Sequence, residues 1–432
     1  MHQPALGIVI SVILVGSLPG TVHAQQSDVL EDFRDESLQF QRPDILSVQE
    51  RPQPAFDSVP YRIDGAEIMP SISVDTQYNS NIFAERDASD DLIVRVRPKL
   101  TATKQFGNLH IATAAEVERQ QYLGKDSQST TDYVLGLRGR YDIDRNGQIY
   151  AGTRSGQRTE DRTDPASPLN VQKPVQYRFA SAYLGAARSF GQLRIAGRAG
   201  VETRNYKDGR DGLDALVDQD FRNRTLLTGD LGAEFAISPD VSVFANGSVN
   251  RRDYKSQPPL LPSRDSQGFE ITAGTSFQLS KLIRSEIGIG YFQQNFKDPE
   301  FEDVGGFAAR AKFEYFITPL VTLTARANRG VEESSTLGSG AYVATSFSLT
   351  ADYELLRNLI VTASGGYERN DFQEIDRHYN TASAKFGAKW QVSPRYALTA
   401  QYDFRDQDAS GLFPGREFTR HRFLAGITIA GM

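Results

Sequence analysis

The feature that most constrains this chain is an alternation of apolar and polar side chains with a period of two residues. In the stretch LRIAGRAGVETRN, residues 193–205, Leu193, Ile195 and Val201 fall on one face, whereas Arg194 and Arg198 fall on the other. Successive side chains of a β-strand point to opposite faces, so this period predicts strands and not helices. Beyond a polar N-terminal segment, about 18 such segments of roughly 10–14 residues follow one another, an even number as in bacterial outer-membrane barrels.

The apolar faces of these segments have almost nothing in the chain to cover them. Only 39% of the residues are hydrophobic, the mean hydropathy is -0.43, and the body of the chain lacks long apolar runs. In lipid an apolar strand face needs no protein cover, and closing the sheet satisfies the backbone and removes the edges. We therefore predict an all-β fold, a transmembrane antiparallel β-barrel of about 18 strands. The alternative is a soluble sandwich or propeller, but a propeller needs a blade-length repeat that the sequence lacks.

The connections between the segments alternate in length. Short turns are expected at residues 106–108, 144–147, 190–192, 238–240, 318–320, 356–358 and 393–395. Longer polar loops fall between them, at residues 160–174, 207–221, 255–264, 296–304 and 406–417. This alternation is typical of transmembrane barrels, which have tight periplasmic turns and longer outer loops.

The N-terminus has the features of an exported protein. The apolar run ALGIVISVILVG, residues 5–16, precedes the small-residue sequence Val22-His23-Ala24, which predicts a signal peptide over residues 1–24. A run of about 12 apolar residues is too short to cross roughly 30 Å of hydrocarbon as a helix. Residues 25–64 are rich in proline and predict an extended or disordered periplasmic segment, which leaves residues 65–432 for the barrel. The chain contains no cysteine, which excludes disulfides and thiolate metal sites.

Two prolines interrupt the strand pattern near its start. Pro70 and Pro98 fall inside the first two predicted strands, where each removes a donor from the hydrogen-bond ladder. A closed barrel has no free edge on which to place them, so we expect a bulge or local break near this seam.

The polar stripes of the predicted strands form the lining of the barrel lumen. They are rich in arginine and contain fewer acids, which is compatible with a wall of paired charges that stiffens the barrel or with a positive pore that attracts anions. The predicted basic lining residues are Arg95, Arg97, Lys99, Arg138, Arg140, Arg154, Arg194, Arg198, Arg204, Arg310, Lys312, Arg326, Lys385, Lys389, Arg420 and Arg422. The predicted acidic lining residues are Glu116, Glu118, Glu202, Asp230, Glu234, Glu270, Glu286, Glu314, Asp352, Glu368 and Asp403.

The first predicted hairpin carries a family resemblance. Residues 65–100 read GAEIMPSISVDTQYNSNIFAERDASDDLIVRVRPKL, with a proline in each strand and a YNSNIF corner between them. This stretch resembles an outer-membrane β-barrel porin family whose members are often encoded beside exopolysaccharide biosynthesis genes. The residues that carry the resemblance are Tyr78, Asn79, Asn81, Phe83 and Pro98. Family members more often have Asp-Asn in the corner, where this chain has Ser-Asn. The resemblance implies a barrel that helps secreted polysaccharide to cross the outer membrane, with periplasmic export proteins as partners.

The sequence offers little that indicates catalysis or a metal site. Beyond residue 24 the histidines are His110, His378 and His421, and none lies in a G-x-S-x-G or similar context. His378 lies near Asp376, but a histidine at a loop edge is more often simply solvated. The loop DGRDGLDALVDQD, residues 208–220, lacks the spacing of an EF-hand, so a solvated outer loop or weak bridging to lipopolysaccharide is expected.

These observations predict a non-enzymatic conduit in the outer membrane of a Gram-negative bacterium, without a cofactor or a bound metal. The preferred role is the outer-membrane component of exopolysaccharide export, with an Arg-rich lumen. A general or anion-preferring diffusion porin for small solutes is the alternative, and an outer-membrane hydrolase is a distant third. The expected partners are membrane lipid and lipopolysaccharide, an acidic polysaccharide and periplasmic export proteins, and no nucleic acid, since the net charge is -6.

Overall fold

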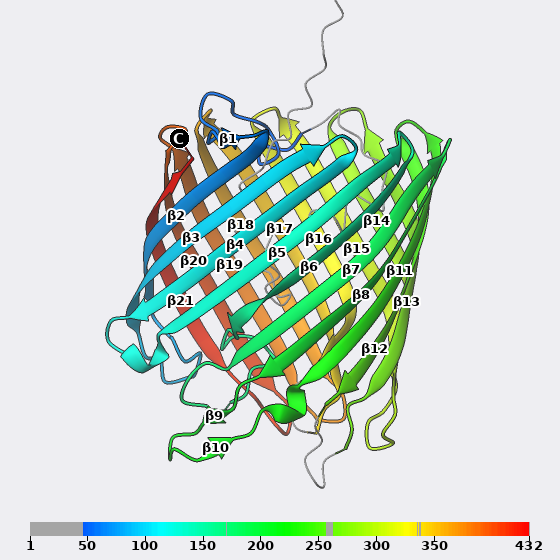
Figure 1. Ribbon diagram of the computed structural model, residues 1–432. Coiled ribbons are helices and arrows are strands. Elements are labelled where there is room, and N and C mark those ends of the chain that lie inside the picture. The colour runs from blue at the N-terminus through cyan, green and yellow to red at the C-terminus, as the bar shows by residue number, and fades with distance from the viewer. Residues whose placement is uncertain (1–45, 170, 256–261, 335, 337, 432) are drawn as a thin grey trace, which may run out of the picture.

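The computed structural model describes residues 46–431 apart from 170, 256–261, 335 and 337. The predicted signal peptide and most of the predicted periplasmic segment therefore lie outside the described residues. Eighteen long antiparallel strands form one closed barrel (Figure 1). They are β2 (Ala66–Asn79), β3 (Asp91–Phe106), β4 (Leu109–Tyr122), β5 (Thr130–Asp144), β6 (Gly147–Thr159), β7 (Gln176–Phe190), β8 (Leu193–Tyr206), β11 (Arg224–Ser238), β12 (Val241–Tyr254), β13 (Ser266–Leu279), β14 (Ile283–Phe296), β15 (Val304–Thr318), β16 (Val321–Glu333), β17 (Ala341–Leu356), β18 (Leu359–Phe372), β19 (His378–Gln391), β20 (Tyr396–Ser410) and β21 (Phe418–Ala430).

The remaining elements are short. β1 (Tyr61–Ile63) pairs with the start of β2, and β9 (Gly209–Arg210) pairs with β10 (Leu216–Val217) in a loop. Two single-turn 3-10 helices, η1 (Asp126–Gln128) and η2 (Asp220–Arg222), also lie in loops. Within the described residues no helix has the length and apolar character needed to cross a membrane.

The barrel closes where β2 pairs with β21, from Ser71 opposite Ala430 to Asn79 opposite Arg422. Every other long strand pairs with its neighbours in chain order, so the sheet has no free edge. Closure matters because hydrocarbon offers no partner for an unpaired backbone N–H or C=O group. The prediction of an antiparallel barrel of about 18 strands is thus confirmed.

Alternation along each strand separates an apolar outer face from a polar inner face. On β11 the outer face carries Leu227, Leu231 and Phe235, which are 45%, 63% and 45% exposed. The inner face of the same strand carries Asp230 and Glu234, and Glu234 is only 1% exposed. Large apolar side chains that are exposed all round a barrel have lipid as their only suitable cover.

Each proline lies where the pairing with one neighbouring strand is interrupted or has not begun, so the N–H donor that proline lacks is not required there. Pro70 stands opposite Leu100 of β3, and on its other side it lies between Ile68, which pairs with β1, and Ser71, the first residue that pairs with β21. Pro98 lies in a gap of the β3–β4 ladder, between the pairs Val96–Arg119 and Lys99–Glu116. The sequence-based expectation of a local break near this seam is therefore met at Pro98.

The two rims of the barrel differ, as the loop lengths predict. Tight turns join the strands at one rim, which also carries β1 and the C-terminus at the top of Figure 1. The longer loops, with β9 and β10, lie at the opposite rim. We call these the short-turn rim and the long-loop rim.

A charge placed on the outer face at mid-strand tests the membrane-facing assignment. We predict that Leu231→Arg destabilises the folded barrel by about 2–4 kcal/mol, because Leu231 is central in β11 and faces hydrocarbon. Urea titration of folding into lipid vesicles measures the loss. Ser248→Arg on the inner face, directly opposite Asp230, is the matched control and should cost much less. Equal costs for the two variants would contradict the assignment.

Candidate functional site

The strand register places the predicted lumen residues on the inner face. Arg140, Tyr150, Gly185, Arg198 and Asp230 stand directly opposite one another across β5, β6, β7, β8 and β11. Directly paired residues of an antiparallel sheet point to the same face. The same alternation puts the other predicted basic and acidic lining residues on this inner face, away from the exposed apolar stripe.

Charge on the inner face is segregated between two walls. Along β11–β18 acidic side chains predominate, and along β19–β21 and β2–β8 basic ones do. On the first wall the acids are Asp230, Glu234, Glu270, Glu286, Glu314, Glu332, Asp352, Glu354 and Glu368, against Arg224, Arg252, Arg284, Arg310, Lys312 and Arg326. The four strands β5–β8 of the second wall carry Arg138, Arg140, Arg154, Arg158, Arg194, Arg198 and Arg204, against Asp132, Asp142 and Glu202.

Glycines allow aromatic rings to lie flat against the basic wall. A Cβ atom at Gly152 would stand 2.5 Å from the Tyr183 hydroxyl oxygen, and one at Gly185 would stand 2.4 Å from Cζ of Tyr150. The rings therefore cover neighbouring strands and do not project into the lumen. The Arg198 guanidinium stacks 4.3 Å above the Tyr183 ring, and that of Arg154 lies 5.1 Å from the Phe179 ring. This stacking fixes the guanidinium groups along the wall.

Several predicted lining residues form ion pairs across or along the strands. Arg97 Nε lies 2.9 Å from Glu118, Lys312 Nζ 3.1 Å from Glu314, Arg204 Nε 2.6 Å from Glu202, and Arg422 Nη2 2.9 Å from Asp403. The lining thus includes a paired, stiffening component. The predicted lists omit several inner-face residues, namely Arg158, Arg224, Arg252, Arg405, Asp132, Asp142, Glu332 and Glu354. Two further omissions, Asp75 and Arg284, pair with Arg95 at 2.5 Å and with Glu314 at 2.6 Å. Both fit the same alternation and could have been found from it.

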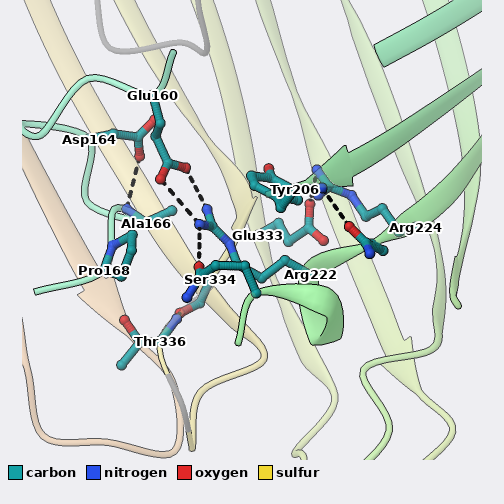
Figure 2. A network of polar contacts seen from close by, with 12 residues as sticks. Glu160, Asp164, Ala166, Pro168, Tyr206, Arg222, Arg224, Glu333, Ser334 and Thr336 are labelled. Carbon is teal, nitrogen blue, oxygen red and sulfur yellow. Dashed lines mark hydrogen bonds and ion pairs between the residues drawn. The ribbon is translucent and has the colours of Figure 1, made fainter. Parts of the chain in front are cut away.

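The loop between β6 and β7, residues 160–175, folds into the barrel. Thr163 accepts a hydrogen bond from Arg405 on the inner face of β20, and Asp161 lies 3.6 Å from Arg420 on the inner face of β21. At its start, Glu160 forms a two-pronged ion pair with Arg222 of η2, at 2.5 Å and 3.2 Å (Figure 2). We call this segment the inward loop, and it narrows the passage near the long-loop rim.

Burial and the neighbouring arginines shift the pKa values of the acidic residues of the inward loop in opposite directions. Burial raises the pKa of Glu160 and of Asp164 above their ordinary values, although Arg222 partly offsets this for both. Burial also acts on Asp161, but Arg420 and Arg422 outweigh it and hold the pKa of Asp161 well below its usual range. Burial, with Arg416 next in effect, lowers the pKa of Arg162 to about 10. The inward loop therefore lies in a strongly positive environment around Asp161.

Buried arginines connect the other loops of the long-loop rim. Arg264 donates to the carbonyl oxygens of Ser334 and Thr336, and Arg416 donates to those of Phe83 and Pro168. Both arginines are almost fully buried, at 6% and 5% exposure. Sequence reasoning did not find these residues, because an arginine in a polar loop has no local signal that separates it from a solvated one.

Arg416 also attaches the YNSNIF corner, residues 78–83, because it donates to the Phe83 carbonyl oxygen. Asn81, which is 1% exposed, donates to the carbonyl oxygens of Glu85 and of Thr419 on β21 and accepts from the Glu85 N–H. Asn79 accepts the Asn81 N–H at 3.0 Å, and the Phe83 ring lies under the Arg162 guanidinium. Tyr78 points to the outer face, 39% exposed. The motif therefore shapes the corner and attaches it to the end of the barrel seam.

At the short-turn rim, residues 47–51 run along the inner wall, and we call them the N-terminal strap. The Val48 N–H donates to Thr322 at 3.1 Å, and the Val48 side chain is fully buried. Glu50 pairs with Arg284 at 2.9 Å, and Arg51 pairs with Glu354 at 2.6 Å. These contacts reach β14, β16 and β17, so part of the predicted periplasmic segment is ordered against the barrel.

The histidines and the acidic loop occupy other places. His378 lies on the outer face between Asp371 at 2.7 Å and Asp376 at 3.4 Å. His421 contacts the Tyr402 hydroxyl at 2.9 Å, also on the outer face, and His110 lies 3.1 Å from Asp142 near a short turn. In the 208–220 loop, carboxylate oxygens of Asp208, Asp218 and Asp220 come within 4.8 Å of one another, all of them on exposed residues.

Comparison with known families identifies the class of barrel. Residues 53–430 match the model of the family described as Putative beta-barrel porin 2. The chain belongs to this family. Membership of this porin family and the apolar outer face of the barrel assign the protein to the outer membrane of a Gram-negative bacterium, in contact with membrane lipid. A search of curated proteins finds no match.

Similar solved structures are outer-membrane proteins. OpdK from Pseudomonas aeruginosa is 11% identical, with a TM-score of 0.48 over 84% of this chain and 99% of that one. OpdL from the same organism is 13% identical, with a TM-score of 0.45 over 85% and 99%. The copper transporter OprC is 11% identical, with a TM-score of 0.47 over 86% and 84%.

The ion pair between Arg222 and Glu160 provides a test of the inward loop. Arg222→Gln leaves the buried Glu160 carboxylate without its partner, a change that typically costs about 3–5 kcal/mol. We expect the inward loop to leave the lumen, which raises single-channel conductance and exposes the loop to trypsin. Arg210→Gln, which breaks an exposed pair with Asp214, is the control and should leave both unchanged. A wild-type conductance for Arg222→Gln would show that this loop does not restrict the passage.

The N-terminal strap can be tested by charge reversal. Arg51→Glu places two carboxylates together at Glu354, so the strap should detach and single-channel conductance should rise. The double variant Arg51→Glu/Glu354→Arg restores the pair and should return conductance toward the wild-type value. Arg62→Glu, at the exposed Arg62–Glu67 pair of the same rim, should have no effect. Failure of the double variant to restore the wild-type conductance would contradict the role of this pair.

Proposed function

We propose that this protein is a passive, anion-preferring conduit and that it serves as the outer-membrane component of exopolysaccharide export. The observation that carries the anion preference is the basic wall of β5–β8, where guanidinium groups outnumber carboxylates and follow the strands along the lumen. A charged lining raises the local concentration of solutes of opposite sign. Guanidinium groups also suit carboxylates, because they bind them through two parallel hydrogen bonds.

The opposing acidic wall supports the same proposal. A lumen with positive charge on one side and negative charge on the other orients a zwitterionic or polar solute as it passes. An acidic polymer with hydroxyl groups has suitable contacts on both sides, since carboxylates meet arginine and hydroxyl groups meet the acidic and amide side chains. The polysaccharide assignment itself rests on the resemblance at the first hairpin, whereas the family match supports only a porin-like barrel.

A diffusion porin for small anions is the second candidate. The inward loop favours it, because a segment fixed across the lumen by Arg222, Arg405 and Arg420 leaves less room for a polymer. The two candidates share the charge preference and differ in cargo. They also differ in whether the inward loop must move for transport: a polymer requires this movement, whereas small anions do not.

Planar-bilayer recording tests the anion preference. We expect the wild-type pore to pass anions more readily than cations in a salt gradient. The triple variant Arg138→Glu/Arg154→Glu/Arg198→Glu should shift the reversal potential toward cation preference. Arg251→Glu, at an exposed pair with Asp253, is the matched control and should behave as the wild type. A cation-selective wild-type pore would overturn the proposal.

Deletion of the gene tests the cargo. If the protein exports polysaccharide, the deletion strain should secrete severalfold less extracellular polysaccharide than the wild type. Expression of the Arg222→Gln variant, in which the inward loop is released, should restore secretion in this strain. Unchanged extracellular polysaccharide in the deletion strain, together with reduced uptake of small anions, would instead assign the protein as a diffusion porin.

A further inference from the structure

Two arginines face each other directly beneath the inward loop. Arg405 on β20 is paired in register with Arg420 on β21, and both side chains point to the inner face. Arg420 is only 4% exposed. Like charges directly opposite one another destabilise a sheet, and the burial of Arg420 leaves little water to screen its charge. The arrangement therefore needs a compensating negative group.

The carboxylates nearby compensate only in part. Arg420 lies 3.6 Å from Asp161 and 3.7 Å from Asp403, and both distances exceed that of a hydrogen bond. Asp403 is engaged by Arg422, whose Nε donates to it at 2.9 Å. Asp161 accepts two hydrogen bonds from Thr163, from its N–H and its hydroxyl, each at 2.9 Å. Both acids are thus committed to other donors.

Several N–H donors of the two guanidinium groups have no hydrogen-bond acceptor in the part of the chain that the structure describes. Arg405 donates from Nη1 to the neutral Thr163 hydroxyl at 3.3 Å. Its Nε and Nη2, and the Nε of Arg420, are shielded from solvent and have no hydrogen-bond partner among the described residues. Asp161, Asp164 and Glu368 act on Arg405 electrostatically and accept no hydrogen bond from it. A buried donor without an acceptor costs free energy, more so when it is charged.

We propose that Arg405 and Arg420 form a binding site for an oxyanion, a carboxylate or phosphate group carried by a solute in the lumen. The proposal deepens the proposed function, because it gives the anion-preferring passage a defined binding position under the inward loop. The inward loop covers these donors, with Thr163 against Arg405 and Asp161 against Arg420, so the anion reaches them when this loop moves aside. A planar carboxylate or a tetrahedral phosphate can then accept from both guanidinium groups at once. The low pKa of Asp161 beside the pair is in accord with a strongly positive potential at this point.

Anion-dependent stability of the purified full-length protein in detergent tests the site. Phosphate and glucuronate are the probes, each compared with chloride at equal ionic strength. We expect both to raise the Tm saturably, by at least about 2 °C, since a ligand that binds only the folded state stabilises it. A rise with phosphate alone or glucuronate alone assigns the site to that chemistry. No rise with either overturns the proposal.

Substitutions separate a binding site from a purely structural pair. Arg405→Gln should abolish the anion-dependent rise, and in chloride it should leave the Tm equal to or above that of the wild type, because repulsion is relieved. Arg420→Gln should also abolish the rise. A structural role for Arg405 predicts the opposite, a lower Tm in chloride with the anion-dependent rise retained.

A matched control excludes a general effect of lumen charge. Arg138→Gln removes an inner-face arginine from β5, four strands away from β21, and should keep the full anion-dependent rise. An equal loss in Arg138→Gln would overturn a localised site. The Tm experiment and the bilayer recording test different claims. If the pore is anion-selective but the anions do not raise the Tm, only the binding site is contradicted. If the anions raise the Tm but the pore is cation-selective, only the proposed function is contradicted.

Discussion

Backbone hydrogen bonding in a solvent without donors or acceptors is the constraint on which this structure depends. In hydrocarbon each unpaired N–H or C=O group costs several kcal/mol, so strands can cross the membrane only as a closed sheet. The pairing of β2 with β21 provides this closure, and β2 also extends past β21 to pair with β1. Pro70 and Pro98 are tolerated because each falls where the ladder is already interrupted or has ended.

Once the outer face is committed to lipid, most charged side chains in the middle of the strands fall on the inner face. A barrel of this width then has to organise a large number of buried charges. The protein does so by separating an acidic wall from a basic one, by stacking arginines on tyrosine and phenylalanine rings, and by placing loops in the lumen. The inward loop and the N-terminal strap restrict the passage near opposite rims, and both are held by ion pairs that are more buried than those of the outer surface.

Alternation in the sequence predicted the closed barrel and its strand number, because a period of two residues is a local property. Contacts between loops could not be predicted in this way. Arg222, Arg264 and Arg416 look like solvated loop residues in the sequence and become buried only when distant loops meet at one rim. The opposition of Arg405 and Arg420 also depends on the exact register between β20 and β21, which alternation alone does not fix.

The central claim, that lipid is the solvent of one face of every strand, can be tested by cysteine scanning of β11, since the chain has no cysteine of its own. Single cysteines at positions 227 to 232 are reacted with a membrane-impermeant maleimide in lipid vesicles. The account predicts reaction at alternate positions, at Thr228 and Asp230 on the inner face and not at Leu227 and Leu231 on the outer face. Equal labelling at all these positions would contradict it.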